Sequence, residues 1–254
     1  MEISTMTAAL PGAIGVTHLK VYDTLTPDGL AGGSPHVHFA CTEAYLVVAG
    51  RGAVQTLSAA GFDETSLTPG RLVWFTPGVI HRLINQDGQL EILVLMQNAG
   101  LPEAGDFALT FPSSILQDER AYWSAASLVS GGQVYATSAE AARHRRDLAV
   151  EGFRVLHGEF ENKGIAALES FYSTALKLIQ SKTDTWRERW ESGPLAAAYR
   201  TGDQLEDLKQ GRYDHLFEGR VYALPAPDGE RALGVCGTLG LYLPEGVAEP
   251  RTEN

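Results

Sequence analysis

Two stretches of the sequence carry most of its information about fold and function. Residues 33–50 read GSPHVHFACTEAYLVVAG, and residues 70–85 read GRLVWFTPGVIHRLIN. Both combine histidine with the apolar runs of β-strands and with glycine or proline at turns. Together they supply three histidines and one acidic residue, which are His36, His38, His81 and Glu43. Several imidazoles and one carboxylate in an apolar setting indicate a site for a single metal ion.

Strand geometry brings two of these histidines together. Side chains alternate between the two faces of an extended chain, so His36 and His38 point to the same side. Their Cα atoms would lie roughly 6.5–7 Å apart, which lets both imidazoles reach one ion. Glu43 follows His38 by five residues and would fall on the opposite face of an unbroken strand. If Glu43 is a ligand, the chain must bend between Phe39 and Thr42.

The two stretches resemble the two signature motifs of the cupin superfamily. The first motif is matched in its histidine pair, its glutamate and its closing glycine by His36, His38, Glu43 and Gly50. The second motif is matched by Gly70, Gly78, His81 and Asn85. The sequence departs from the motifs at two turn positions: Leu30 stands where the first motif opens with glycine, and Thr76 stands where the second has proline.

The pattern of strands and turns agrees with the fold that this resemblance implies. Turn residues recur every 8–12 positions over residues ~15–112, which is typical of an antiparallel sandwich or barrel. We expect strands at Thr17–Thr24, Glu43–Ala49, Ala53–Leu57, Phe62–Leu67, Arg71–Phe75, Val79–Asn85 and Leu90–Gln97. The resemblance implies that they form a mainly β domain over residues 1–112, an antiparallel double-stranded β-helix, also called a cupin or jelly-roll barrel.

Residues 113–254 predict a helix-rich region packed on or over the barrel. Apolar side chains at i, i+3 and i+4 spacing predict an amphipathic helix over Ile165–Ile179. Gly193-Pro194 is expected to end the helix before it. The chain is expected to finish in a β-hairpin with strands at Arg220–Leu224 and Ala232–Leu243. Whether this region is a packing layer, a lid over the barrel or a dimer arm stays open.

Composition limits the partners and the compartment. The net charge of −11 and the pI of about 5.1 argue against nucleic acid and anionic membranes as partners. No apolar run approaches the ~20 residues that span a bilayer, and the N-terminal residues lack a signal-peptide pattern. The two cysteines, Cys41 and Cys236, are typical of a reducing compartment. We therefore expect a cytoplasmic protein, and the resemblance implies a homodimer.

The candidate site follows from the motifs and from strand parity. The expected ligands of one divalent transition metal per chain (Fe, Mn, Ni or Zn) are His36, His38, Glu43 and His81. Glu43 and Tyr45 share one face of their strand, so both are candidate catalytic residues. Glu43 would act as a ligand or, once displaced, as a base. Tyr45 would orient a ligand or contact the substrate, and either Trp74 or Phe75 would form an apolar wall.

Three functions fit a site of three histidines and one glutamate. The favoured hypothesis is a metal-dependent, dioxygenase-like enzyme that acts on a small organic substrate. The second is a sugar or sugar-phosphate isomerase or epimerase with the metal as Lewis acid, for which Arg51, Arg71 and Arg82 are available as phosphate-binding residues. The third is a non-catalytic cupin that binds a small molecule or carbohydrate. A shared fold does not choose among them.

Overall fold

The strands of the protein form two antiparallel sheets that face each other. The computed structural model describes residues 9–128, 138–227 and 229–242. The six-stranded sheet has the order β10-β11-β1-β8-β3-β6, and the five-stranded sheet has the order β5-β4-β7-β2-β9. The strands of the first sheet are β1 (Gly15–Val21), β3 (Glu43–Ala49), β6 (Leu72–Phe75), β8 (Glu91–Met96), β10 (Ala232–Leu233) and β11 (Gly237–Leu241). Those of the second are β2 (His36–Val37), β4 (Gly52–Ser58), β5 (Gly61–Leu67), β7 (Ile80–Asn85) and β9 (Ala108–Leu109). The expected antiparallel β-barrel fold is confirmed.

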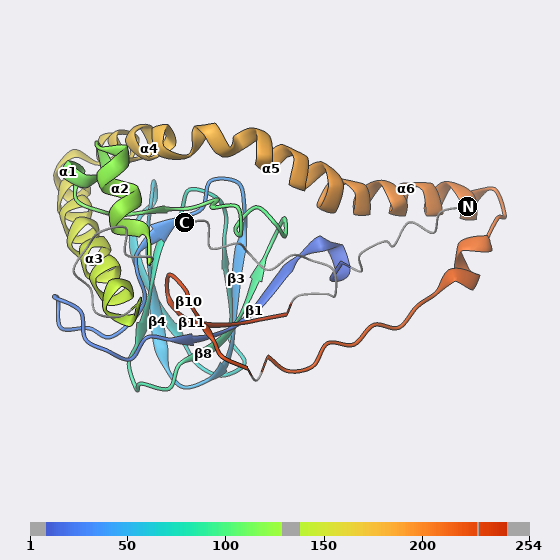
Figure 1. Cartoon of the computed structure of the whole chain (residues 1–254), viewed down its shortest axis with the longest axis horizontal. Coiled ribbons are helices and arrows are strands. Elements are labelled where there is room, and N and C mark those ends of the chain that lie inside the picture. Colours follow the sequence, from blue (N-terminus) through green and yellow to red (C-terminus); the bar gives the residue numbers. More distant parts are fainter. Residues whose placement is uncertain (1–8, 129–137, 228, 243–254) are drawn as a thin grey trace.

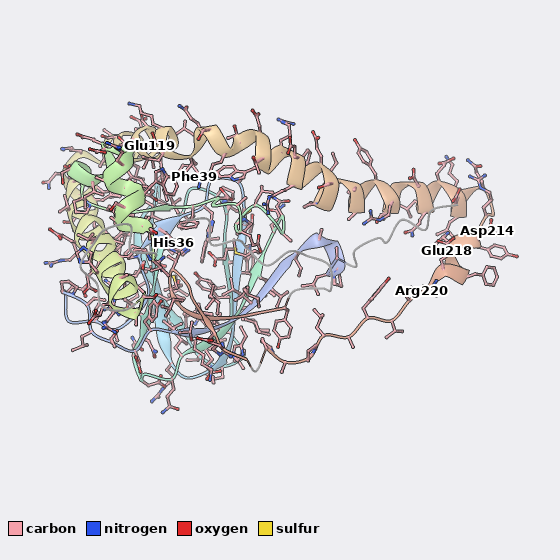
Figure 2. The ribbon with its side chains drawn as sticks, in the orientation of Figure 1. His36, Phe39, Glu119, Asp214, Glu218 and Arg220 are labelled. Carbon is pink, nitrogen blue, oxygen red and sulfur yellow. The ribbon has the colours of Figure 1, made fainter. Side chains whose placement is uncertain are left out.

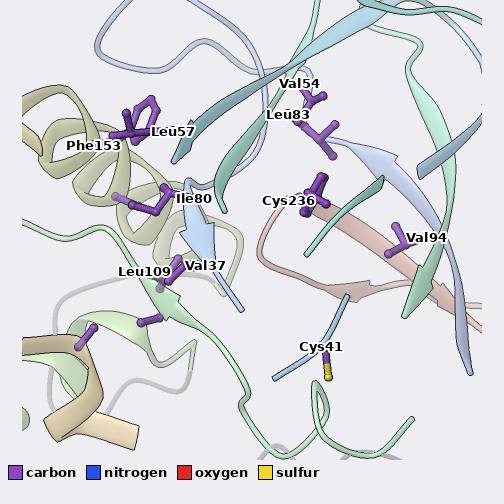
Figure 3. Close-up of a cluster of buried hydrophobic side chains, with 14 of the residues drawn as sticks. Val37, Cys41, Val54, Leu57, Ile80, Leu83, Val94, Leu109, Phe153 and Cys236 are labelled. Atoms are coloured by element: carbon purple, nitrogen blue, oxygen red, sulfur yellow. The ribbon is translucent and has the colours of Figure 1, made fainter. Parts of the chain in front are cut away.

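The core lies between the two sheets, and alternation along the strands fills it. In β3 every second residue from Glu43 to Val47 is buried, and in β8 the buried positions are Ile92, Val94 and Met96. β7 is buried at all six positions because its outer face is covered as well. Figure 3 shows Val37, Ile80 and Leu109 of this core together with Phe153 from a helix.

Helices follow the strands in the second half of the chain. They are α1 (Ser113–Leu116), α2 (Glu119–Ala126), α3 (Ser138–Lys163), α4 (Ile165–Ile179), α5 (Thr183–Trp190) and α6 (Ala196–Lys209). Shorter turns are η1 (Pro11–Ala13), η2 (Gln180–Lys182), η4 (Asp214–Glu218) and a π-helical turn, η3 (Glu191–Leu195). No helix within the described ranges is long and apolar enough to cross a membrane.

α3 and α4 form a layer that packs on the barrel. Their apolar side chains belong to the same buried cluster as the strands. The Thr110 hydroxyl donates to the backbone oxygen of Ala149 in α3 (2.8 Å), and the Tyr172 hydroxyl of α4 donates to the backbone oxygen of Gly78 (2.6 Å). α5 and α6 instead continue away from the barrel, and residues 210–227 turn back towards it (Figure 1).

The predicted C-terminal hairpin exists, but its strands are wrong. β10 and β11 pair with each other, and the backbone N–H of Gly234 closes the turn on the oxygen of Gly237 (2.7 Å). Residues 220–224 form no strand, because the hairpin turn lies at Gly234 rather than between the two predicted strands. The predicted end at Leu243 lies outside the described residues.

The predicted helix end at Gly193-Pro194 is also wrong. Pro194 lies inside η3, and α5, η3 and α6 run on without a break. Proline removes one N–H and clashes with the preceding turn of a regular α-helix. The wider π turn accommodates the ring locally, so the helix continues.

A buried ion pair between Asp28 and Arg82 fastens the loop that precedes β2 onto strand β7. Arg82 is 1% exposed, and its guanidinium donates to the Thr26 hydroxyl (2.9 Å) and to Asp28 Oδ1 (3.2 Å). Burial raises the pKa of the Asp28 carboxyl, but the hydrogen bonds from Arg82 and Thr26 outweigh this effect and lower the pKa to about 2. The loop therefore depends on an ionised Asp28.

Asp28→Ala is expected to lower the free energy of unfolding by about 3 kcal/mol, because it leaves the Arg82 charge buried without its partner. The pair stabilises the wild type above pH ~4, and this contribution is lost as the pH falls towards the folded-state pKa. Thermal unfolding of both proteins at neutral and acid pH would check this, since their difference should shrink in acid. Asp87→Ala is the control, because the Asp87–Arg51 pair is exposed and 3.9 Å long. Equal losses in the two variants would contradict the prediction.

Candidate metal centre

The four expected ligands come from both sheets. His36 of β2 and His81 of β7 are directly paired neighbours in the five-stranded sheet. β2 ends at Val37, the chain bends through residues 39–40, and Glu43 opens β3 in the opposite sheet. The predicted bend between Phe39 and Thr42 is therefore present, and it also carries the chain from one sheet to the other. Figure 2 shows His36 within the barrel below α2.

The ligand atoms converge at distances suited to one ion. His36 Nε2 lies 3.1 Å from His81 Nε2, and Glu43 Oε2 lies 3.0 Å from His81 Nε2 and 3.4 Å from His38 Nε2. One donor atom from each of the four residues lies within 4.8 Å of the other three, and all four residues are buried. Bonds of about 2.0–2.2 Å to a metal place neighbouring tetrahedral or octahedral ligands about 3.0–3.5 Å apart.

Backbone carbonyls orient the three imidazoles. Nδ1 of His36 donates to the oxygen of Ser34 (2.9 Å), Nδ1 of His81 donates to that of Val79 (3.0 Å), and Nδ1 of His38 donates to that of Asp106. Each Nδ1 thus carries a hydrogen, and each Nε2 faces the common centre. Two of the three carbonyls lie two residues before their histidine, so strand geometry itself supplies the support.

The centre leaves a negative atom without a hydrogen bond. Glu43 Oε2 is buried and makes no hydrogen bond of acceptable geometry within the described chain. Burying a carboxylate oxygen without a partner is costly. A cation at this point would contact that oxygen and all three Nε2 atoms, whereas a proton can bridge only one pair of atoms. The residues present therefore fit a divalent transition metal.

Electrostatics keep the centre ready for a cation. Burial lowers the pKa of His36 well below its usual value, and the neighbouring His81 and His38 lower it further, so this ring is neutral. Burial raises the pKa of the Glu43 carboxyl, but the attraction of His81 and the contact with His38 outweigh it and hold that pKa well below its usual range. Glu43 is therefore an anion inside the barrel. Burial lowers the pKa of His38, but the nearby Glu43 and Asp106 raise it overall.

Asp106 supports the centre and was missed by sequence reasoning. It is fully buried; its carboxylate accepts the backbone N–H groups of Phe39 (2.9 Å) and Ala40 (3.1 Å), and its carbonyl holds His38 Nδ1. One residue therefore fixes both the bend and a ligand. Its only sequence signal is an acidic residue between Gly105 and an apolar strand, which matches no motif.

Asp106→Ala is expected to weaken metal binding by about 10–100-fold, because it releases the bend that aims His38 while leaving all four ligands in place. Isothermal titration of the metal-free protein with Zn²⁺ or Mn²⁺ would measure the change. Asp106→Asn should lose less, since its amide oxygen still accepts the two N–H groups. Asp63→Ala, on the exposed strand β5, is the control. Unchanged affinity in Asp106→Ala would contradict a positioning role.

The structure decides the orientation of the other predicted side chains. Tyr45 is buried on the same face as Glu43, and its ring lies 6.2 Å from that of His81. Phe75 faces inward with its ring 4.1 Å from the His81 ring, whereas Trp74 is 65% exposed on the outer face. Phe107, which sequence reasoning missed, completes the apolar wall at 6.2 Å from the His36 ring. Asn85, which closes the second motif, has a structural role, because its side chain bonds the backbone of Val21 and Leu90.

The two cysteines are free and buried. Cys236, from the C-terminal hairpin, places its sulfur 3.9 Å from His36 Nδ1. Burial raises the pKa of both thiols, so neither is a reactive thiolate.

A protein-family model matches part of the chain. The family model Cupin_1, described as Cupin, matches residues 16–117. No curated protein matches the sequence. The matched range contains all four clustered residues.

Solved structures give only distant likenesses. A Bacillus subtilis oxalate decarboxylase variant is 19% identical, with a TM-score of 0.25 over 26% of this chain and 18% of that chain. KdgF from Halomonas sp. is 21% identical, with a TM-score of 0.24 over 26% of this chain and 57% of that one. A TDP-fucose-3,4-ketoisomerase from Campylobacter jejuni is 12% identical, with a TM-score of 0.27 over 32% and 57%.

Each alignment spans less than two thirds of the solved chain, and none assigns a function to this protein. The family match, the two facing antiparallel sheets and the buried cluster of three histidines and one glutamate agree with one another. Residues 16–117 of this chain form a cupin domain.

Proposed function

We propose that this protein is a metal-dependent enzyme, dioxygenase-like in its chemistry, that acts on a small organic substrate at the cupin site. The observation that carries the proposal is the convergence of three Nε2 atoms on one buried carboxylate oxygen that lacks a hydrogen bond. A bound Fe, Mn, Ni or Zn ion would supply Lewis acidity there and, for Fe or Mn, redox chemistry. Four protein ligands leave one or two positions of a five- or six-coordinate ion for small molecules.

The residues around the proposed ion have three different roles, which are to hold the ion, to act as a base and to exclude water. His36, His38 and His81 are held by their backbone acceptors, so little reorganisation is needed when an ion binds. Glu43 would balance part of the charge of a bound ion and, once displaced, would act as a base. Phe75 and Phe107 exclude water from the imidazoles, which strengthens electrostatic interactions at the centre.

Tyr45 is proposed as the residue that orients Glu43. Burial raises the pKa of its hydroxyl well above the usual value, and the charge of Glu43 and a hydrogen bond to that carboxylate raise it further. The hydroxyl therefore stays protonated, and we propose that Tyr45 serves as a donor towards Glu43 rather than as a base. Tyr45→Phe should leave the barrel folded and alter turnover more than metal content.

The sugar-phosphate alternative lacks support from the arginines named for it. Arg82 is committed to Asp28, and Arg51 follows β3 at the end opposite to Glu43. Arg71 precedes β6 at the same far end, because Leu72 pairs with Leu46 while Phe75 pairs with Glu43. The non-catalytic alternative predicts a different effect of metal removal. If the protein only binds a small molecule, loss of the metal would change its stability, and there would be no turnover to lose.

The deciding experiment is metal analysis of the protein purified without added metal, followed by reconstitution with Fe²⁺, Mn²⁺, Ni²⁺ and Zn²⁺ in turn. We expect close to one equivalent of one metal, and uptake of O2 with a small organic substrate in the Fe or Mn form. Less than a tenth of an equivalent with no uptake on reconstitution would overturn the metal site. A filled site that shows substrate isomerisation without O2 consumption would favour the Lewis-acid alternative instead.

The homodimer and the cytoplasmic location expected from the sequence remain proposals. They do not depend on the metal, and the surfaces that would carry a dimer are considered next.

A further inference from the structure

The outer face of the six-stranded sheet is apolar over much of β3, β6 and β8, where a solvent-facing sheet is ordinarily polar. The side chains that alternate with the buried positions of β3, β6 and β8 point outward, and they include Leu46, Val48, Leu72, Trp74, Leu93 and Leu95. Leu46 pairs with Leu72 on one side and with Leu93 on the other, so these side chains form one continuous patch. Trp74 is 65% exposed and Leu72 is 51% exposed. We call this patch the sheet face.

A second apolar surface lies on residues 196–222, which we call the arm. Within the described chain no residue of α6 or η4 is buried. The arm nevertheless exposes large apolar side chains, namely Tyr199, Leu205, Leu216, Phe217, Val221 and Tyr222. Figure 1 shows α6 projecting from the barrel, and Figure 2 shows Asp214, Glu218 and Arg220 at the distant end. α6 continues α5 and η3 without a break, yet none of its own side chains is buried within the described chain.

Both ends of the arm are attached next to the six-stranded sheet. Before it, Trp186 of α5 donates to the backbone oxygen of Ala104 (3.1 Å), and Arg189 donates to that of Gly100 (3.3 Å), in the loop after β8. After it, the chain returns to β10, which pairs with β11 beside β1. The chain thus enters and leaves the arm beside the six-stranded sheet, yet the apolar side chains of the arm and of the sheet face both remain exposed.

We propose that a second copy of this chain covers both surfaces, with the arm of each copy lying across the sheet face of the other. Each chain carries both an arm and a sheet face. A two-fold axis therefore covers the arm and the sheet face of both copies and leaves no such surface free for a third chain. Phe, Tyr and Trp side chains bury roughly 150–250 Å² each, so Tyr199, Phe217 and Tyr222 of the arm together with Trp74 of the sheet face offer roughly 600–1,000 Å² per chain. That matches the ~800 Å² per partner of a stable interface. The contact specifies the surfaces of the homodimer proposed above and does not depend on the metal.

Charge on the arm agrees with a protein partner rather than a membrane or nucleic acid. α6 carries Arg200 and Lys209 together with Asp203, Glu206 and Asp207, so it has no field of one sign. The chain as a whole has a net charge of −11. Anionic lipids and phosphates would be repelled, whereas a mixed rim around an apolar centre is typical of protein interfaces.

The test uses the full chain and two substitutions on different surfaces, Trp74→Glu on the sheet face and Phe217→Glu on the arm. Sedimentation over a broad dilution series should show a wild-type dimer and a dissociation constant raised by at least about 30-fold in each variant. Leu176→Glu is the control, because Leu176 is an exposed apolar residue of α4 outside both surfaces. Circular dichroism and metal content should stay unchanged in all three variants.

Hydrogen exchange separates the arm contact from any other dimer. Amides of α6 should be protected in the wild-type dimer and lose protection in Trp74→Glu, although that substitution is not in the arm. A wild-type monomer would overturn both the homodimer and the arm contact. A dimer that survives both substitutions would overturn the arm contact alone, as would protection of α6 in a monomer or an assembly larger than two.

Discussion

His81→Ala is expected to reduce metal binding by at least about 100-fold and to abolish turnover while the barrel stays folded. Among the four proposed ligands, His81 lies closest to both His36 and Glu43, and its ring is completely buried. Without it, two nitrogens and one carboxylate remain, and the Phe75 ring loses its main aromatic neighbour. Losing an outer-shell support already costs 10–100-fold, so loss of a ligand should cost more.

Metal analysis and thermal unfolding would measure this effect together. In the wild type, metal at about 1,000 times its dissociation constant should raise the free energy of unfolding by about 4 kcal/mol. The same addition should raise the free energy of unfolding of His81→Ala by no more than about 1.4 kcal/mol, because a 100-fold weaker site sees metal at only about 10 times its dissociation constant. His157→Ala on α3 is the matched control, since that histidine stacks on Phe62 at the surface and touches none of the clustered residues. A variant that keeps a full equivalent of metal and its thermal response would contradict the assigned site.

Two glycines of α3 are expected to respond to alanine in opposite directions. At Gly152 an added Cβ would lie 2.0 Å from the backbone oxygen of Thr110 and 2.4 Å from the carbonyl carbon of Phe111. At Gly158 nothing lies within 4 Å of that position. Gly152→Ala should therefore force the helix away from the barrel and lower the free energy of unfolding by about 3 kcal/mol. Gly158→Ala should raise it by about 0.5–1 kcal/mol, because alanine loses less backbone freedom on folding.

Calorimetry of both variants would show these shifts as opposite changes in Tm. About 2–4 °C per kcal/mol is typical for a chain of this size, so Gly152→Ala should unfold about 10 °C earlier and Gly158→Ala slightly later. The two substitutions are chemically identical and lie less than two helical turns apart, so each serves as the control for the other. Destabilisation of similar size at both positions would show that α3 does not pack on residues 110–112 as closely as described.

The parts of the site that depend on local geometry were predictable from the sequence. Alternation placed His36 and His38 together, and it required the bend that the structure has before Glu43. Asp106 and Cys236 were not predictable in this way. They reach His38 and His36 from 68 and 200 residues further along the chain, and no local pattern encodes such contacts.

The helical half shows a similar limit. The apolar spacing of Ile165–Ile179 predicted α4 with its observed bounds, because one face of it is buried. The continuation through Pro194 was missed, since proline ordinarily ends a helix and the π turn that accommodates it has no simple sequence signal. The exposure of α6 follows from where α5 points, which is a property of the packing of α5 on residues 100–104.

The segment that leads to His36 is supported by the C-terminal hairpin, which is synthesised long after it. β11 completes the pairing of β1, and the backbone oxygen of Val235 accepts both the N–H and the hydroxyl of Ser34, two residues before His36. Gly33 meets Cys236 so closely that an added Cβ would lie 2.7 Å from it. His36 is thus the first of the four clustered residues to be synthesised, and it receives its full support only when the C-terminal hairpin has been made. Contacts that join such distant residues form late in folding, so a nascent chain ending before Ala232 would hold its ligands in an unfinished site.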